Sequence, residues 1–188
     1  EAERVVKSVC KTNADNGVPY SEIAVLYRKN AQSRVIEEAL RKSGVPYRVY
    51  GGLSFYERKE VKDAIAYFRM TVNPNDDEAF RRVVNYPARG IGNTTLEKLM
   101  SVATNNGISL WETVNTFAAK ELGVSATTYG RISKFVAMIN GFAAKAGELD
   151  AYALGNEILE ESGVRTEIVT DTSDLSRKEN LDELINAL

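Results

Sequence analysis

A short apolar run over residues 23–26 that leads directly into a helical pattern constrains the fold of this chain more than any other feature. The run ends in Tyr27 and Arg28, and its composition suits a buried β-strand. Residues 47–50, which are rich in aromatic and β-branched side chains, suit a second strand after the helix. A strand–helix–strand order predicts a right-handed crossover and a parallel pair of strands. The first part of the chain is therefore expected to be an α/β segment.

Helical patterns cover most of the remaining chain. Asn30 is a good N-cap for the helix that follows the first strand, and Gly44 lies where a left-handed C-terminal cap is expected. Pro74 disfavours helix in the residue before it, so we expect a break near residue 73. Periodic apolar residues predict helices over 1–12, 57–72, 77–86, 94–106, 109–119, 126–146, 151–162 and 178–187. The sequence thus predicts an α/β segment at 1–72 and an all-α segment at 73–188.

Composition excludes several kinds of site. The 188 residues contain one cysteine, Cys10, and no histidine. This excludes an internal disulfide, histidine acid–base chemistry and a zinc site built on these residues, and no metal site is predicted. No apolar run approaches the roughly 18 residues that a bilayer crossing needs. A single cysteine favours an intracellular, cytoplasmic setting. The first residues include no initiator Met, so we expect the chain to be part of a longer protein.

Charge is unevenly distributed along the chain, although the net charge is only −2. Residues 21–70 carry ten Lys and Arg against six Asp and Glu, and residues 81–100 carry four against one. Residues 121–188 carry six Lys and Arg against twelve Asp and Glu. Contact with a polyanion is therefore favoured in the first half of the chain and poorly supported in the second.

Tyr27 and Arg28 are the first candidates for a ligand site. The carboxyl end of a parallel strand is where open α/β sheets bind ligands. A tyrosine ring there can stack on a base, and an arginine can neutralise charge on a γ-phosphate. The alternative is a half-buried tyrosine at the end of a strand, beside an arginine that pairs with a neighbouring acid.

A second candidate block follows the glycines at 51–52. Phe55 and Tyr56 can serve as stacking platforms for single-stranded bases, with Arg58 and Lys62 along the track of the backbone. The alternative is that the aromatic rings fill the core while the charged residues form solvated pairs along a helix. A phosphate-binding loop is excluded, because the pattern G-x-x-x-x-G-K-[ST] is not matched in this chain.

The third candidate is the hairpin Arg89-Gly90-Ile91-Gly92, which joins two predicted helices. Small residues let a phosphate approach, and the start of the next helix, which contains Thr95, offers free N–H donors. This pattern is typical of a helix-hairpin-helix element that grips the duplex backbone without reading its sequence. The alternative is a tight turn between helices that needs glycine for its conformation.

These three blocks resemble, in the same order, motifs of the UvrD/Rep/PcrA group of superfamily 1A DNA helicases. Residues 25–34 are similar to motif IV, residues 51–63 to motif IVa, and residues 89–92 to the Gly-Ile-Gly element of the 2B domain. The resemblance implies that residues 1–72 are part of the RecA-like domain 2A. Residues 73–188 would then be most of the helical 2B subdomain.

The resemblance also implies roles for individual residues. Tyr27 would stack on the adenine of ATP, and Arg28, as a catalytic residue, would contact the γ-phosphate. Arg58 and Lys62 would lie near the single-stranded track. The residues expected to touch duplex DNA are Arg89, Gly90, Ile91, Gly92 and Thr95.

The whole protein would then be a bacterial, ATP-dependent 3′-to-5′ DNA helicase that uses ATP with Mg²⁺. Its partners would be single-stranded and duplex DNA, and repair or replication proteins that bind the helical subdomain. No segment of this sequence matches the motifs that carry the phosphate-binding lysine and the Mg²⁺-binding acids of such an enzyme. Alone, the chain should therefore neither hydrolyse ATP nor unwind DNA. Two alternatives remain open: a subunit of an AddA/RecB-type helicase–nuclease, and a stand-alone helical DNA-binding or protein-docking module.

Overall fold

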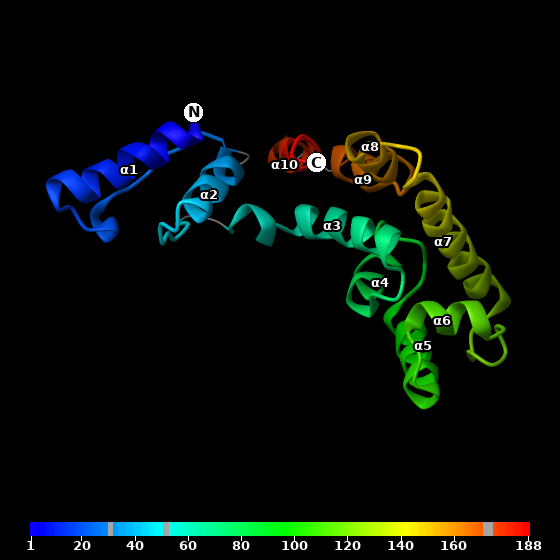
Figure 1. Ribbon diagram of the computed structural model, residues 1–188. Helices are drawn as coiled ribbons and strands as arrows, with labels where there is room; N and C mark the ends of the chain where they lie inside the picture. The colour runs from blue at the N-terminus through cyan, green and yellow to red at the C-terminus, as the bar shows by residue number, and fades with distance from the viewer. Residues whose placement is uncertain (30–31, 51–52, 171–174) are drawn as a thin grey trace. The chain divides into compact units, whose positions relative to one another are not determined.

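The computed structural model describes residues 1–29, 32–50, 53–170 and 175–188 (Figure 1). The chain divides into two compact units. Unit 1 comprises Glu1–Lys62 and Asp174–Leu184, and unit 2 comprises Asp63–Ser173 and Ile185–Leu188. Asn30, the expected N-cap, and the glycines at 51–52 lie outside the described residues. The domain boundary near residue 73 stays a prediction.

Unit 1 is built on two packed helices, α1 (Ala2–Asn16) and α2 (Gln32–Lys42). Val6 and Val9 of α1 form a buried cluster with Leu40 of α2 and with Val45, which follows the glycine C-cap at 44. The unit also contains the 3-10 helices η1 (Tyr20–Glu22) and η2 (Phe55–Glu57), the start of α3 (Lys59–Val72) and most of α10 (Leu175–Ile185). Its core is small and lies between helices.

The prediction of an α/β segment with parallel strands is wrong. The structure is 68% helical, and the residues that it describes contain no strand. Segments 23–26 and 47–50 each pack some side chains on the α1–α2 cluster but leave others in solvent: Leu26 is 93% exposed and Tyr50 is 83% exposed. A parallel pair of strands is stable only when both of its faces are covered. Two four-residue segments with an open face do not meet that condition.

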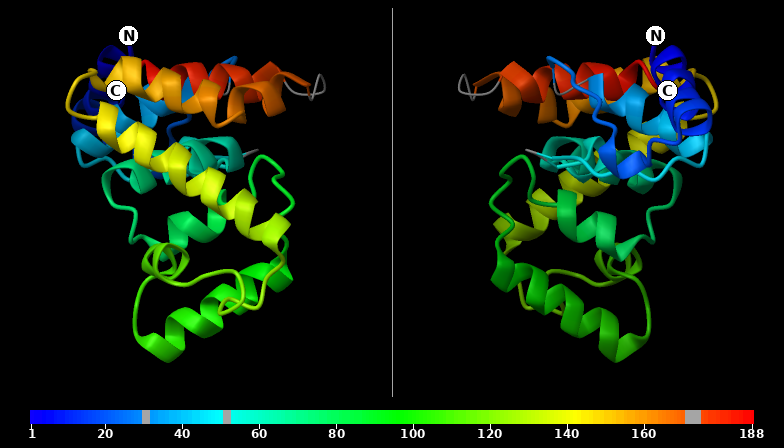
Figure 2. Two further views of the ribbon diagram at one scale, coloured as in Figure 1. Left: turned by 90° about the vertical axis from the view of Figure 1, so that its right-hand side faces the viewer. Right: turned by 90° about the vertical axis from the view of Figure 1, so that its left-hand side faces the viewer.

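Unit 2 contains most of α3 and the helices that the sequence predicts between residues 73 and 162; the helix predicted over 178–187 corresponds to α10, most of which belongs to unit 1. The helices of unit 2 after α3 are α4 (Asp77–Val83), α5 (Asn93–Asn106), α6 (Leu110–Thr116), α7 (Ala126–Lys145) and α8 (Ala151–Glu161), followed by α9 (Val164–Thr170), which was not predicted. Figures 1 and 2 show α7 running along the unit from the α5–α6 end to the α8–α9 end. Phe80 of α4 and Phe135 of α7 meet edge to face in the core, with ring centroids 5.6 Å apart.

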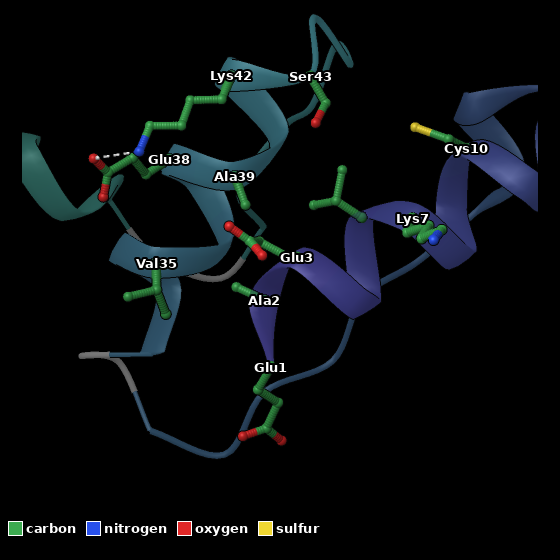
Figure 3. A pocket seen from close by; sticks show the side chains of 11 residues that line it. Glu1, Ala2, Glu3, Lys7, Cys10, Val35, Glu38, Ala39, Lys42 and Ser43 are labelled. Carbon is green, nitrogen blue, oxygen red and sulfur yellow. Dashed lines mark ion pairs between the residues drawn. The ribbon is translucent and has the colours of Figure 1, made fainter.

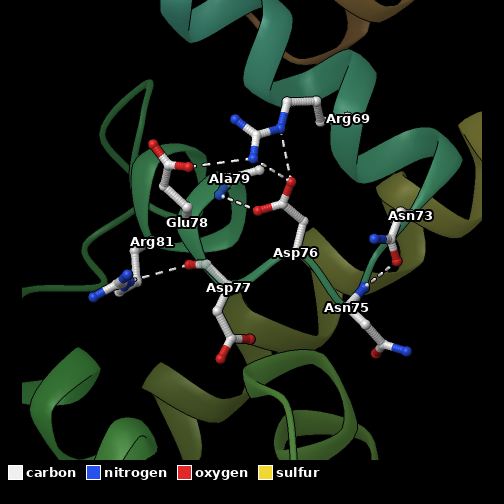
Figure 4. Close-up of polar contacts among 8 residues, drawn as sticks. All are labelled: Arg69, Asn73, Asn75, Asp76, Asp77, Glu78, Ala79 and Arg81. Atoms are coloured by element: carbon white, nitrogen blue, oxygen red, sulfur yellow. Dashed lines mark hydrogen bonds and ion pairs between the residues drawn. The ribbon is translucent and has the colours of Figure 1, made fainter.

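The break predicted at Pro74 separates α3 from α4 (Figure 4). Asp76 caps α4, because its side chain accepts the backbone N–H of Ala79 at 3.0 Å. Its carboxylate also pairs with Arg69 of α3 at 2.6 Å. The N–H bond from Ala79, and then the Arg69 charge, hold the pKa of the Asp76 carboxyl below its usual value. The start of α4, which leads to the glycine hairpin, is thus tied to α3.

Candidate functional site

The loop that carries Tyr27 and Arg28 is held by the helix that follows it. The side-chain oxygen of Gln32, the first residue of α2, accepts the backbone N–H of Arg28 at 3.1 Å and that of Lys29 at 2.9 Å. The backbone N–H of Gln32 donates in turn to the carbonyl of Lys29 at 3.0 Å. Tyr27 is half-buried and Arg28 is exposed. The backbone is therefore restrained while the Arg28 guanidinium stays at the surface.

Helix α10 returns to this loop from late in the sequence. Lys29 pairs with Glu179 at 2.6 Å, and Arg34 of α2 pairs with Glu38 at 2.9 Å and with Glu183 at 2.8 Å. Burial by itself lowers the pKa of the Arg34 guanidinium, but its hydrogen bond and ion pair with Glu183 hold the pKa above the ordinary value. Of the two neighbouring cations in the loop, Lys29 is therefore paired with α10, and Arg28 faces solvent.

Arg58, one of the expected DNA contacts, points into unit 1. Its guanidinium donates to Asn180 at 2.7 Å and to the Ser33 hydroxyl at 3.1 Å, and it lies over the Phe55 ring. Asn180 also donates to Glu60 at 2.6 Å. All five side chains are buried. The network ties α2, the start of α3 and α10 together. This arrangement of Arg58 differs from both predictions for it, a DNA contact at the surface and a solvated ion pair along one helix.

The other residues of the same block divide between core and surface. Phe55 is fully buried, and its backbone N–H donates to the buried Glu37 carboxylate at 3.0 Å. Tyr56 is half-buried, with its ring edge-on to Phe55 at 5.2 Å between centroids. Lys62 is exposed. Phe55 thus fills the core, and Lys62 is the member of the expected pair of DNA contacts that remains accessible.

The glycine hairpin is shaped by Asn85, whose side-chain oxygen accepts the backbone N–H groups of Arg89 and Ile91, both at 2.9 Å. The Ile91 side chain is fully buried. Gly90 has a φ of 70°, a left-handed conformation that glycine adopts without strain. Gly90 and Gly92 are exposed. The hairpin therefore presents its backbone outward and its one large apolar side chain inward.

Gly92 is also the N-cap residue of α5, a helix of 14 residues. Its carbonyl accepts the backbone N–H of Thr95 at 3.0 Å, and Thr95 itself is half-buried. A glycine N-cap has no side chain with which to accept first-turn N–H groups. The start of α5 is therefore open to an acceptor from outside the chain.

Arg89 turns away from solvent to support this hairpin. Its guanidinium donates to three backbone carbonyls of residues 83–87 at 2.9 to 3.2 Å, to the Tyr67 hydroxyl at 2.7 Å and to the Ser162 carbonyl at 2.9 Å. It also lies over the Phe135 ring. Burial raises the pKa of the Tyr67 phenol to about 12, and the Arg89 charge limits that rise. Arg89 thus joins the hairpin to α3 and to the turn after α8.

A surface groove of about 850 Å³ between α1 and α2 contains none of the residues expected to bind ATP or DNA (Figure 3). Within the described ranges, no group of three or more His, Cys, Asp or Glu side chains is placed to hold a metal ion. The helices that the structure describes include none that is both long enough and apolar enough to cross a membrane. The candidate interfaces are therefore the Arg28 loop and the glycine hairpin.

Sequence reasoning missed the residues that support these two loops from a distance. Asn180 lies 122 positions after Arg58, and no local pattern connects them. Asn85 falls inside the helix predicted over 77–86, but α4 ends at Val83, which leaves its side chain to organise the hairpin. An Asn two positions before Pro87 was a usable signal of a turn.

A family model for the UvrD-like helicase C-terminal domain matches residues 1–187. The chain is 39% identical to DNA helicase II of Escherichia coli (strain K12) over 189 residues, covering 100% of this chain and 26% of that protein. It is 43% identical to the ATP-dependent DNA helicase PcrA of Bacillus subtilis (strain 168) over 168 residues, covering 88% of this chain and 22% of that protein. The PcrA protein of Staphylococcus epidermidis (strain RP62A) is 39% identical over 188 residues, covering 99% of this chain and 25% of that protein. The chain thus spans about a quarter of the length of these curated relatives.

Proposed function

The chain belongs to the family of UvrD-like helicase C-terminal domains, and we propose that it supplies an ATP-contacting loop and a duplex-contacting hairpin to an ATP-dependent DNA helicase. Relatives that match the whole chain are named DNA helicase II and ATP-dependent DNA helicase PcrA, which supports this assignment. In this proposal residues 1–72 belong to domain 2A and residues 73–188 to the helical 2B subdomain. The complete protein moves 3′ to 5′ along one strand of DNA.

At the ATP site, the Tyr27 ring stacks on the adenine and the Arg28 guanidinium contacts the γ-phosphate. The exposed Arg28 side chain on a backbone held by Gln32 carries this part of the proposal. A guanidinium positioned in this way neutralises the charge that develops on the phosphoryl oxygens during transfer. Mg²⁺ neutralises charge on the bound phosphates, and its ligands come from outside this chain. Lys29 contributes less, because Glu179 already pairs with it.

At the DNA interface, the backbone of Gly90 and Gly92 and the first turn of α5, which includes Thr95, receive duplex phosphates. The outward-facing hairpin backbone and the open helix start support this role. Arg89 and Ile91 hold the hairpin from inside, since the one is bonded to carbonyls and the other is buried. On the single-stranded track, Lys62 contacts the backbone and Arg58 supports it from the interior.

The test of the ATP role is Arg28→Ala in the complete helicase. An arginine that acts on the γ-phosphate is worth on the order of 10³ or more in turnover, so DNA-stimulated ATP hydrolysis should fall at least that far. Thermal unfolding should not change, because the Arg28 side chain is exposed. Lys29→Ala is the matched control and should keep most of the turnover. Near-normal hydrolysis by Arg28→Ala removes Arg28 from the active site.

A further inference from the structure

A second arginine reaches the glycine hairpin from a distant helix. Arg131 lies on α7, is exposed, and donates from Nη1 to the carbonyl oxygen of Gly90 at 3.0 Å. The two residues are 41 positions apart in the sequence. Nothing in the hairpin pattern pointed to α7. The contact places a positive charge directly against the exposed hairpin backbone.

Gly90 and Arg131 fit together sterically as well as through this hydrogen bond. A Cβ atom at position 90 would lie 2.3 Å from Nη1 of Arg131 and 2.9 Å from Cζ of its guanidinium. Any side chain at that position must therefore displace the guanidinium. The glycine serves two purposes, since it also adopts a φ of 70°. By contrast, a Cβ at Gly92 would meet no atom within 4 Å.

The two arginines at the hairpin differ in how many donors they leave available. A guanidinium has five N–H donors. Five hydrogen bonds to protein acceptors engage the two terminal nitrogens of Arg89. In the part of the chain that the structure describes, Arg131 makes one hydrogen bond, to Gly90. Most of its donors therefore face solvent beside the loop.

We propose that Arg131 is the residue that supplies positive charge to the duplex-binding hairpin, with one N–H bonded to Gly90 and up to two of the others donated to a backbone phosphate of duplex DNA. The proposal rests on the duplex-binding role of the hairpin proposed above. The bond to Gly90 orients the guanidinium and lowers the conformational entropy that phosphate binding must remove. A phosphate contact of this kind adds affinity without adding sequence preference.

The test compares Arg131→Ala with Lys134→Ala in the complete helicase, since Lys134 is an exposed cation one turn further along α7. Binding of a tailed duplex and of a single strand is measured over a range of KCl concentrations. Affinity falls as salt rises, and losing one phosphate contact makes the plot of log affinity against log salt less steep by about 0.9. Arg131→Ala should show that change, with about fivefold weaker binding, on the duplex alone. Arg131→Lys should restore the slope, and Lys134→Ala should match the wild type.

A glycine substitution provides an independent route to the same result. Gly90→Ala should expel the guanidinium, so that adding Arg131→Ala to it causes no further loss of salt slope. Gly107→Ala controls for backbone strain, because Gly107 has a φ of 65° and no atom within 4 Å of a built Cβ. It should leave duplex binding at the wild-type level.

The outcomes separate this assignment from the proposed function. If the wild type prefers the tailed duplex and Arg131→Ala binds it with unchanged affinity and slope, the Arg131 assignment is overturned and the hairpin role stands. An equal loss on duplex and single strand, or no recovery in Arg131→Lys, also overturns the assignment. If the wild type shows no preference for the duplex and Gly90→Ala changes nothing, the proposed role of the hairpin itself fails.

Discussion

Arg28 in unit 1 and Arg89 in unit 2 both lie in short loops that lead into a helix, yet the protein uses them in opposite ways. Around Arg28 the backbone is held by Gln32 and the side chain is exposed. Around Arg89 the guanidinium is bonded inward to carbonyls, and the backbone of the hairpin is exposed. A cation in a recognised motif can thus be the group that meets the ligand or the group that builds the loop. The acceptors around it decide which.

Arg89→Ala should strongly destabilise unit 2, because the Arg89 guanidinium holds the hairpin from inside. Removing the guanidinium abolishes five hydrogen bonds, including those to the partly buried carbonyls of Pro87 and Ser162, which should cost unit 2 about 4 kcal/mol of stability. Native-state hydrogen exchange in the complete helicase should show the hairpin amides of residues 89–92 losing protection. Arg28→Ala should leave the exchange of both loops unchanged.

The opposite result would show that Arg89 acts on the ligand and does not build the loop. If Arg89→Ala keeps its amide protection but loses duplex binding with a lower salt slope, then Arg89 itself meets the phosphate and the inward bonds are secondary. Arg89→Lys separates the two cases further. It keeps a charge but cannot reproduce the planar fork, so a structural Arg89 predicts that Arg89→Lys remains unstable.

Tyr67→Phe tests whether the phenol that accepts a hydrogen bond from Arg89 is buried in the folded protein. Burial raises the pKa of Tyr67 to about 12, above its ordinary value of 10.0, so the folded protein keeps the phenol protonated where the unfolded chain loses that proton. The free energy of unfolding should therefore be unaffected by this group below about pH 10 and should fall by about 3 kcal/mol as the pH rises to about 12. Tyr67→Phe should remove that part of the alkaline decline.

The measurement is the difference in hydrogen-exchange protection of unit 2 between the wild type and Tyr67→Phe, taken at matched steps from pH 9 to pH 12 and corrected for the intrinsic rate. Lysines and other tyrosines contribute equally to both proteins, so they cancel in the difference. An alkaline decline of the same steepness in both would show that Tyr67 titrates as an ordinary exposed phenol. Arg89 would then lack the buried partner assigned to it.

The sequence predicted the helices and the positions of the loops better than it predicted what the loops do with their side chains. Helical periodicity and the break at Pro74 located α3 to α8 to within a few residues, because both signals are local. The predicted strands failed because strand formation depends on cover from other segments, and Leu26 shows that this cover is missing. No local pattern could reveal that Arg58 is bonded to Asn180 or that Arg131 contacts Gly90.

The motif residues illustrate the same limit at the candidate site. A cluster of arginine, glycine and aromatic residues indicated a ligand-binding segment, but the same residue types also build turns and cores. Phe55 fills the core and Lys62 stays exposed although both come from one block of sequence. Which of the two roles a residue takes depends on its burial and on hydrogen-bond acceptors that lie far away in the sequence. The spacing of residues in a motif predicts neither of these.

Gln32→Leu tests whether Arg28 needs a restrained backbone, and its effect should be modest. Leucine has a similar size but cannot accept the N–H groups of Arg28 and Lys29, so the loop should sample more conformations and position Arg28 less often. Losing these two hydrogen bonds is worth about 1 to 2 kcal/mol, or roughly tenfold in kcat/KM for DNA-stimulated ATP hydrolysis. Gln32→Glu keeps an acceptor and should retain most of the activity.

If Gln32→Leu hydrolyses ATP normally, or if both variants lose activity alike, the loop does not need Gln32 as an acceptor. A loss confined to Gln32→Leu, with unchanged thermal unfolding, would show that Arg28 depends on a restrained backbone just as the hairpin backbone depends on a restrained arginine.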